Sequence, residues 1–389
     1  MNLVSGAIAG ALAATAVSVG AQDPPVRTLL CPIAELPDAF LEVSAVRELP
    51  DGRVIVVDGN EFAVYVADFR SGRRQQLGRN GRGPGEYVLP TRLYELPGDS
   101  TAVLDEGQAH LLVMDGKPRF VTTIYLLGNT PGVRPDFARA IIEGVDDAGR
   151  YYGRAMPIRV GRGGTRELTE SAAIQRWTAA SPRRDTVGYV RVEPDPTRRL
   201  VAGSVVSRAS NRAFRTAPQW AVSRDGRVAV VDWKPYQVTF LHPDGRVARG
   251  QPINYQPVRV TREVREEFLE AEARPRPFLA NARGGGAPFV TLRKGSRTTE
   301  DAWDFPEFLP PFLQRAVRFD RDGRLWIQRT SPHGAATSFD LVDDSGSVAE
   351  RVVLPQRARL IGFGENVAYL VRLDQDDLQY LQKYRLPSR

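Results

Sequence analysis

Charged side chains recur at one position of a repeated stretch of the sequence. Each copy has a turn built on Asp-Gly or a similar pair, and then a short apolar run that ends in the residue of interest. In six copies that position holds, in chain order, Asp58, Asp105, Ala155, Asp232, Arg329 and Arg372. Carboxylate and guanidinium groups that open on one face would form a mixed-charge rim, suited to a polar or zwitterionic ligand.

Two aromatic residues follow the fourth copy. Trp233 and Tyr236 follow Asp232 and would add a stacking surface to the same ligand-binding face. A structural interpretation competes with the ligand-binding one. Each Asp would accept backbone N–H bonds within its own turn, and the aromatic rings would pack between repeats.

A second candidate site is a glycine-rich loop that reads Gly-Arg-Asn-Gly-Arg-Gly-Pro-Gly-Glu-Tyr over residues 78–87. Its glycines permit a sharp backbone reversal, and its exposed N–H groups could also hold an anion. The residues concerned are Arg79, Gly81, Arg82, Gly83, Gly85 and Glu86. The loop lacks the Gly-Lys-Ser/Thr of a nucleotide-binding P-loop.

Signals for catalysis are sparse. The chain has three histidines without a metal-binding spacing, and it contains no Gly-x-Ser-x-Gly motif. Asp58, Asp105 and Asp232 could supply oxygen ligands to calcium, although Arg329 and Arg372 at the same level would disfavour a cation. We therefore expect no resident metal or other cofactor, with calcium as the exception that the alternative function would require.

The repeated stretch predicts the elements that position these residues. Its clearest copies are residues 49–58, 223–232 and 320–329, each with a strand before the turn and further strands after it. Repeats that cannot bury their own faces stack on one another, which favours an all-β six-bladed β-propeller of four-stranded antiparallel blades. Two long intervals between turns leave seven blades as the alternative.

The last repeat is one strand short. The strand predicted at Val26–Cys31 has no other partner, so we expect it to pair with the final repeat and close the ring between residues 26 and 386. The longer interval contains an insertion at 254–315, with a helix at about 261–273 capped by Thr261. A glycine-rich loop at 283–287 would make this insertion a mobile cover over one face.

Three stretches resemble a known family. Gly78–Tyr87, followed by Pro90, looks like the G-x-x-G-x-G-P-G-E-[FY] loop of secreted bacterial six-bladed β-propellers related to NHL-repeat proteins. Phe319–Ile327 and Asp376–Leu386 are similar to the late-blade and closing motifs of that family. The resemblance implies the fold, and it brings no agreed catalytic residues to this sequence.

The N-terminal stretch, the cysteine count and the net charge limit which compartment and which partners the protein can have. Residues 1–21 form a small-residue apolar stretch that ends in a cleavage-like pattern, which predicts a signal peptide and a periplasmic or secreted protein. Cys31 is the only cysteine, so no internal disulfide can form. With 53 basic and 46 acidic residues, the charge of +7 is small, and many arginines lie in turns.

These features together predict an exported, noncatalytic scaffold that binds a small polar ligand or a protein partner on one face of the propeller. The alternative function is a calcium-assisted hydrolase or lyase of the propeller lactonase type. We expect a monomer with no nucleic-acid partner and no stable membrane insertion after the signal peptide is removed.

Overall fold

The computed structural model describes residues 23–126, 142–195, 197–201, 204–206, 211–280, 289–295 and 297–386. The predicted signal peptide and the predicted flexible loop at 283–287 lie outside the described residues.

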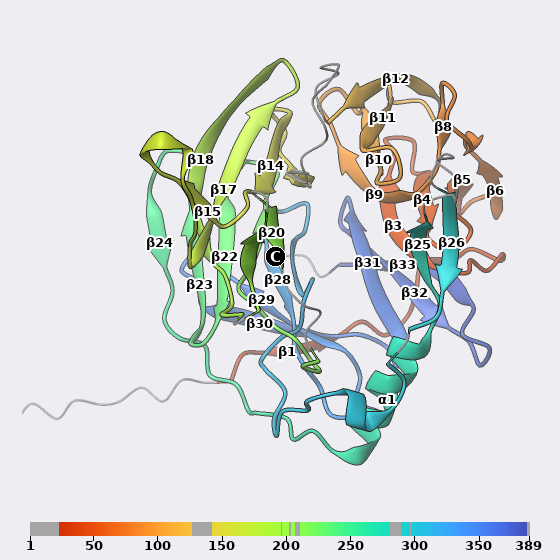
Figure 1. Ribbon diagram of the computed structural model, residues 1–389. Helices are drawn as coiled ribbons and strands as arrows, with labels where there is room; N and C mark the ends of the chain where they lie inside the picture. The colour runs from red at the N-terminus through yellow and green to blue at the C-terminus, as the bar shows by residue number, and fades with distance from the viewer. Residues whose placement is uncertain are drawn as a thin grey trace, which may run out of the picture.

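Within this part of the chain, six antiparallel sheets stand around a central axis as the blades of a propeller (Figure 1). The predicted six-bladed fold is therefore confirmed. Each blade begins with its innermost strand, because the first strands of neighbouring blades contact one another around the axis.

The strands are given blade by blade, from the axis outwards. Blades 1 and 2 contain β3 (Val43–Glu48), β4 (Val54–Asp58), β5 (Ala63–Asp68), β6 (Arg73–Gln76), and β9 (Pro90–Glu95), β10 (Thr101–Asp105), β11 (His110–Met114), β12 (Phe120–Tyr125). Blades 3 and 4 contain β13 (Ile142–Val145), β14 (Arg150–Arg154), β17 (Ser171–Thr178), β18 (Ser181–Arg191), and β21 (Gln219–Val222), β22 (Val228–Trp233), β23 (Tyr236–Leu241), β24 (Val247–Arg249). Blades 5 and 6 contain β27 (Val317–Phe319), β28 (Leu325–Gln328), β29 (Ser338–Val342), β30 (Val348–Val353), and β31 (Ala358–Gly364), β32 (Val367–Leu373), β33 (Gln379–Arg385).

The core lies between blades, because both faces of a blade are covered by its neighbours. Every residue of β4 and β10 is buried. Ile55 of blade 1 packs in one apolar cluster with Leu112 and Met114 of blade 2. Trp326 of blade 5 packs in the same way against Leu370 of blade 6. The second strand of each repeat is apolar in sequence for this reason, and blade-to-blade packing stabilises the ring.

The N-terminal segment closes the ring at a place other than the predicted one. The strand predicted at Val26–Cys31 does not pair with the final repeat. Instead β1 (Val26–Thr28) runs parallel to β30 as a fifth strand of blade 5. The missing strand of blade 6 is β2 (Ala34–Glu35), which pairs antiparallel with β33. Closure by the N-terminal segment is correct, but the closing strand begins eight residues later.

The ring has two different faces. One, which we call the hairpin face, bears the Asp-Gly turns between the first and second strands of the blades. Gly52, Gly226 and Gly323 in these turns have φ of 85°, 85° and 77°, a left-handed conformation that glycine adopts without strain. The opposite face, at the other end of the second strands, is the one on which the recurring charged residues were predicted to open.

The insertion docks on that opposite face, which we call the cap face (Figure 1). Its helix α1 (Arg262–Ala273) is capped by the Thr261 hydroxyl, which accepts the N–H of Val264. On the ring, Asp377 binds Arg274 at 3.1 Å, and His333 lies 3.1 Å from Glu267. The helix contributes Val264 to an apolar cluster, whose other members lie outside the helix: Val258, Val260, Phe305 and Leu309, with Phe214 beside them. No helix among the described residues is long and apolar enough to span a bilayer.

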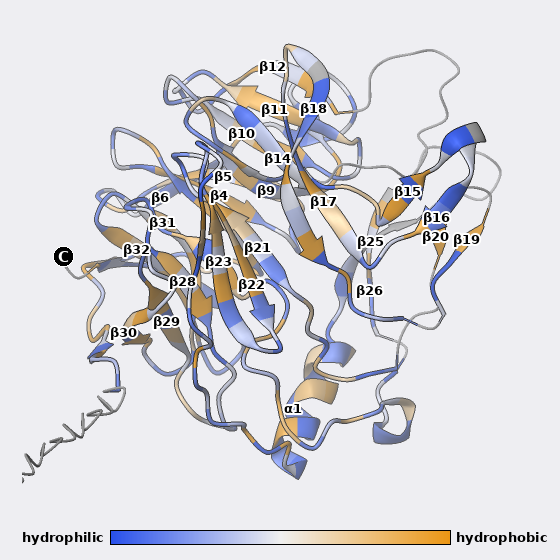
Figure 2. Cartoon of the chain, turned by 90° about the vertical axis from the view of Figure 1, so that its left-hand side faces the viewer, coloured by the Kyte–Doolittle hydropathy of each residue, from blue (hydrophilic) through white to orange (hydrophobic). Residues whose placement is uncertain are grey.

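Short accessory elements lie outside the six blade sheets. These are β7 (Arg79–Asn80), β8 (Glu86–Tyr87), β15 (Ile158–Val160), η1 (Arg162–Gly164), β16 (Arg166–Leu168), β19 (Arg199–Val201), β20 (Ser204–Val206), β25 (Arg276–Ala280), β26 (Phe289–Arg293) and η2 (Glu300–Ala302). Figure 2 shows β15–β16 and β19–β20 grouped together, apart from the apolar strands of the blades.

Candidate functional site

The recurring acids of blades 1 and 2 are buried and fully engaged in local structure. The Asp58 carboxylate accepts the backbone N–H groups of four residues at 2.8–3.1 Å: Leu41, Glu42, Asn60 and Glu61. Asp105 does the same for Val88, Leu89 and Gly107, and also accepts Gln108 Nε2 at 3.0 Å. Both side chains tie a cap-face turn to the incoming chain, which matches the structural interpretation of these residues.

In blade 4, the predicted site residues bind neighbouring strands. Asp232 accepts a hydrogen bond from Arg191 at 3.1 Å. Trp233 Nε1 donates to Glu193 at 2.7 Å. The buried Tyr236 packs against Phe312 and donates its hydroxyl to Asp340 of blade 5 at 3.2 Å.

The two predicted arginines are also paired. Arg329 lies 3.6 Å from Asp340, so the structure brings Tyr236 and Arg329 together at that carboxylate. Arg372 binds Glu35 of β2 at 3.0 Å. Between described residues, no hydrogen bond or ion pair joins these arginines to Asp58, Asp105 or Asp232. The arrangement fastens blades to one another and to the closing strand.

The glycine-rich loop contains its own anion. The Glu86 carboxylate accepts the Gly83 N–H at 2.7 Å and Arg79 Nε at 2.6 Å. These two bonds, the Gly83 one first, lower the pKa of Glu86. Gly81 is needed here because a Cβ at that position would lie 2.1 Å from Glu86 Oε2. Gly85 has φ of 73°, and Arg82 lies between the two glycines that face the carboxylate.

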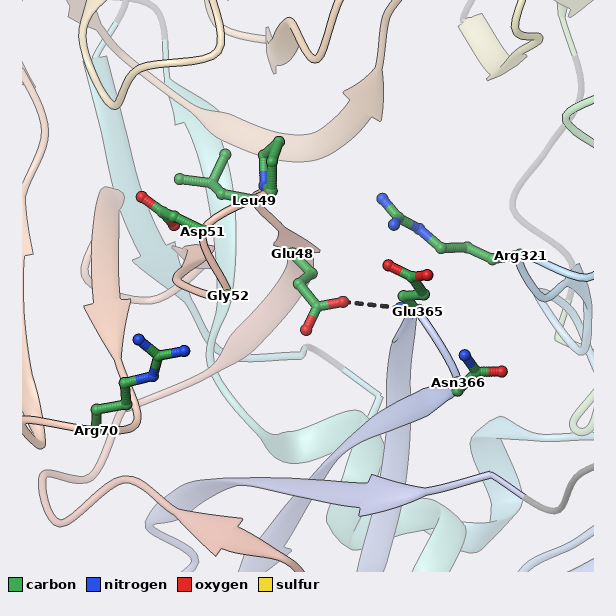
Figure 3. Close-up of a pocket in the computed structure, with 9 residues that line it drawn as sticks. Glu48, Leu49, Asp51, Gly52, Arg70, Arg321, Glu365 and Asn366 are labelled. Carbon is green, nitrogen blue, oxygen red and sulfur yellow. Dashed lines mark hydrogen bonds between the residues drawn. The ribbon is translucent and has the colours of Figure 1, made fainter.

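A pocket opens instead on the hairpin face, between blades 1 and 6. Its volume is about 340 Å³, within the range of small-molecule sites. Arg70 and Arg321 approach it from different sides, with Glu48 and Glu365 between them (Figure 3). The lining residues come from turns of three blades: Glu48, Leu49, Pro50, Asp51, Gly52, Arg70, Arg321, Glu365 and Asn366.

Three side chains of this pocket are free to bind a ligand. Among the described residues, none makes a hydrogen bond or ion pair with the Arg70 guanidinium, the Glu365 carboxylate or the Asn366 carboxamide. All three residues are exposed. Together they offer a positive group, a negative group and an amide to a molecule in the pocket.

Glu48 forms a fixed part of the pocket wall. Its carboxylate accepts Lys383 Nζ and the Tyr369 hydroxyl, each at 2.7 Å, and the Glu365 N–H at 2.7 Å. Burial acts to raise the pKa of Glu48, but these three hydrogen bonds outweigh burial and lower it. The same carboxylate, together with burial, raises the pKa of Tyr369. Glu48 therefore remains ionised and joins blade 6 to blade 1.

Next to the pocket, one carboxylate holds three arginines from three other blades. Glu95 of β9 lies 2.6 Å from Arg321, 3.4 Å from Arg224 and 3.7 Å from Arg47. Blades 1, 2, 4 and 5 can meet only at the axis, so this cluster stands at the mouth of the central channel. Burial lowers the pKa of Arg47, and the charges of Arg321 and Arg224 add to that effect.

The sequence contained a signal for this cluster that the repeat alignment passed over. Arg224 and Arg321 occupy the same position, directly before Asp-Gly, in the turns of blades 4 and 5. Pro50 occupies that position in blade 1 and also lines the pocket. The residue before Asp-Gly in the recurring turn therefore could have directed attention to the hairpin face as the place of a binding site.

Among the described residues, no three His, Cys, Asp or Glu side chains are grouped so that they could hold a metal ion.

Comparison with known proteins finds distant similarity to solved structures and no match to a family or to a curated sequence. A putative exported protein from Bacteroides fragilis is similar in structure, with 12% identity, coverage of 90% of this chain and 92% of that one, and a TM-score of 0.47. A calcium-binding protein, regucalcin, from Agrobacterium tumefaciens has 12% identity, coverage of 93% and 97%, and a TM-score of 0.35.

An aldose sugar dehydrogenase from Streptomyces coelicolor, in its PQQ-bound form, has 14% identity, coverage of 93% and 99%, and a TM-score of 0.41. The first of these three names describes no activity, and the other two describe a calcium-binding protein and a sugar dehydrogenase. At such identities and scores, none of the similarities carries an argument about the function of this chain.

Proposed function

We propose that this protein is an exported, noncatalytic binding protein that takes a small zwitterionic ligand in the hairpin-face pocket. The observation that carries the proposal is the set of free groups around the 340 Å³ pocket. The Arg70 guanidinium suits a carboxylate of the ligand, and the Glu365 carboxylate suits an ammonium group. Asn366 can donate to or accept from either.

The other two carboxylates of the pocket are held by bonds within the protein. Glu48 already accepts three hydrogen bonds, and Asp51 is bound by Arg53 at 2.6 Å. The pocket walls are thus fixed, and a ligand would meet prepositioned charges at its two ends.

Thermal unfolding with a matched panel of small molecules tests the proposal. The panel consists of free α-amino acids, the amines that lack the carboxylate and the acids that lack the ammonium group. A ligand at about 100 times its Kd stabilises a protein by about 2.7 kcal/mol. We expect one or more amino acids to raise Tm by several degrees, and their matched amines and acids to do so much less.

Variants localise the effect. Arg70→Gln and Glu365→Gln should abolish the rise in Tm. Arg246→Gln, a change of the same kind in the exposed β23–β24 turn on the same face and outside the pocket lining, should preserve it. The proposal is wrong if no zwitterion raises Tm, or if both pocket variants respond like the native chain. Titration with calcium separates the alternative function, because heat of binding together with lactone hydrolysis would favour a calcium-assisted enzyme.

A further inference from the structure

The positive charge of the chain is concentrated in one segment. Residues 154–215 contain thirteen arginines, no lysine and five acidic residues, a formal charge of +8. The remainder of the chain has 40 basic and 41 acidic residues and is close to neutral. Eight of the thirteen arginines lie in the outer strands of blade 3 and in the two accessory hairpins β15–β16 and β19–β20.

The two hairpins lie side by side, because β16 contacts β19. In the first hairpin Val160 stands directly opposite Arg166, and Ile158 opposite Leu168, so these four side chains share one face. In the second hairpin Arg199 stands opposite Val206, and Val201 lies on the same face. Each hairpin therefore combines arginine with aliphatic side chains on a single face.

These aliphatic side chains are accessible. Val160 is 64% exposed, Val201 49%, Val206 42% and Leu168 37%. Single exposed apolar residues are ordinary, but four on two adjoining hairpins form a group that leaves much of its apolar surface in contact with water.

We propose that this surface, made of the Val160–Leu168–Arg166 and Val201–Val206–Arg199 faces, docks on an anionic lipid bilayer. Guanidinium groups bind phosphate through paired hydrogen bonds. Aliphatic side chains gain free energy at the boundary between headgroups and acyl chains, and the two contributions add for surface-bound elements. A polyanion in water would use the arginines but would leave the valines exposed. The proposal concerns docking at the surface, and it is independent of the ligand pocket.

Sedimentation with vesicles tests the proposal on the full chain. We expect binding to phosphatidylcholine mixed with phosphatidylglycerol, and little binding to phosphatidylcholine alone. Each arginine near an anionic surface contributes about 1 kcal/mol, so Arg166→Glu combined with Arg199→Glu should weaken binding by about tenfold or more. Val160→Ser combined with Val206→Ser should weaken it by roughly tenfold through the lost apolar contact.

A matched control is available on another hairpin. Arg246 and the 61% exposed Val247 lie at the β23–β24 turn of blade 4. Arg246→Glu combined with Val247→Ser changes the same residue types and should leave vesicle binding intact. Unchanged Tm values for all variants would show that the fold is preserved.

Three outcomes would overturn the proposal. One is the absence of binding to the anionic vesicles. Another is equal binding by the native chain and both hairpin variants. The third is a native response of the valine variant together with full competition by soluble polyphosphate, which would identify a general polyanion surface instead.

Discussion

Two sets of charged residues, at opposite ends of the same strands, are used in opposite ways. On the cap face, Asp58 accepts four backbone N–H groups and Arg372 is bound to Glu35. On the hairpin face, Arg70 and Glu365 border the pocket and have no such partners among the described residues. The difference separates charges that build the ring from charges that are available to another molecule. A charged residue indicates a binding site only when its hydrogen-bonding capacity is left over after folding.

The largest expected effect comes from removing a fully engaged acid. Asp58→Ala would leave four backbone N–H groups without their acceptor, and we expect a loss of about 3–5 kcal/mol in the free energy of unfolding. Asp58→Asn should cost less, since one oxygen accepts three of the four bonds and can be retained. Chemical denaturation measures both. A cost for Asp58→Ala below about 1 kcal/mol would contradict the structural role.

A smaller effect, dependent on pH, is expected at Glu48. Its pKa is lowered in the folded protein, so its contribution to stability is present above the unfolded value and is lost as pH falls through the folded pKa. Glu48→Gln should cost about 2 kcal/mol at pH 7. That cost should shrink as the pH falls below about 4.3, the value for an unfolded Glu. Unfolding curves at several pH values measure it, and a constant difference between the two proteins would refute the linkage.

In the glycine-rich loop, the expected effect is smaller again. Gly81→Ala would force the Glu86 carboxylate away from the loop, because the new Cβ would lie 2.1 Å from Oε2. We expect Tm to fall by about 2–4 °C. In a Glu86→Ala background the same substitution should have little effect. Additive losses in the double variant would show that the glycine has another purpose.

The smallest effect on stability is expected in the pocket. Arg70→Gln and Glu365→Gln should each change the free energy of unfolding by less than about 0.5 kcal/mol, because neither side chain contributes a bond to the fold. The same denaturation experiments provide the measurement. A loss comparable to that of Asp58→Asn would place these residues with the structural acids and remove the contrast between the two faces.

The blades could be predicted from sequence because each carries its own local signal. An Asp-Gly turn before a buried apolar strand is visible within about ten residues, as in 49–58. The closing strand was misplaced because β2 has only two residues and shows no periodicity. The apolar stretch just before β2 was predicted as the closing strand instead, although its strand β1 belongs to blade 5.

The candidate site depended on information that no local pattern holds. Asp58 and Glu365 are both charged residues close to turns, and only the fold reveals that the first is saturated and the second is free. The pocket draws Arg70, Arg321 and Asn366 from turns of three different blades. The charge of segment 154–215 was present in the sequence but was diluted by counting arginines over the whole chain.

The N-terminal strands also set the order in which the molecule can be finished. β1 pairs with β30 and β2 pairs with β33. Residues near position 30 therefore contact strands that lie more than three hundred residues later in the sequence. Contacts of such long sequence separation form slowly. Until synthesis passes blade 5, the first-made segment has no sheet to join, and the edge of blade 6 stays unsealed until the end of the chain is made. A chain that is translocated before it folds would meet this topology without difficulty, whereas folding during synthesis would leave the seam open until the end.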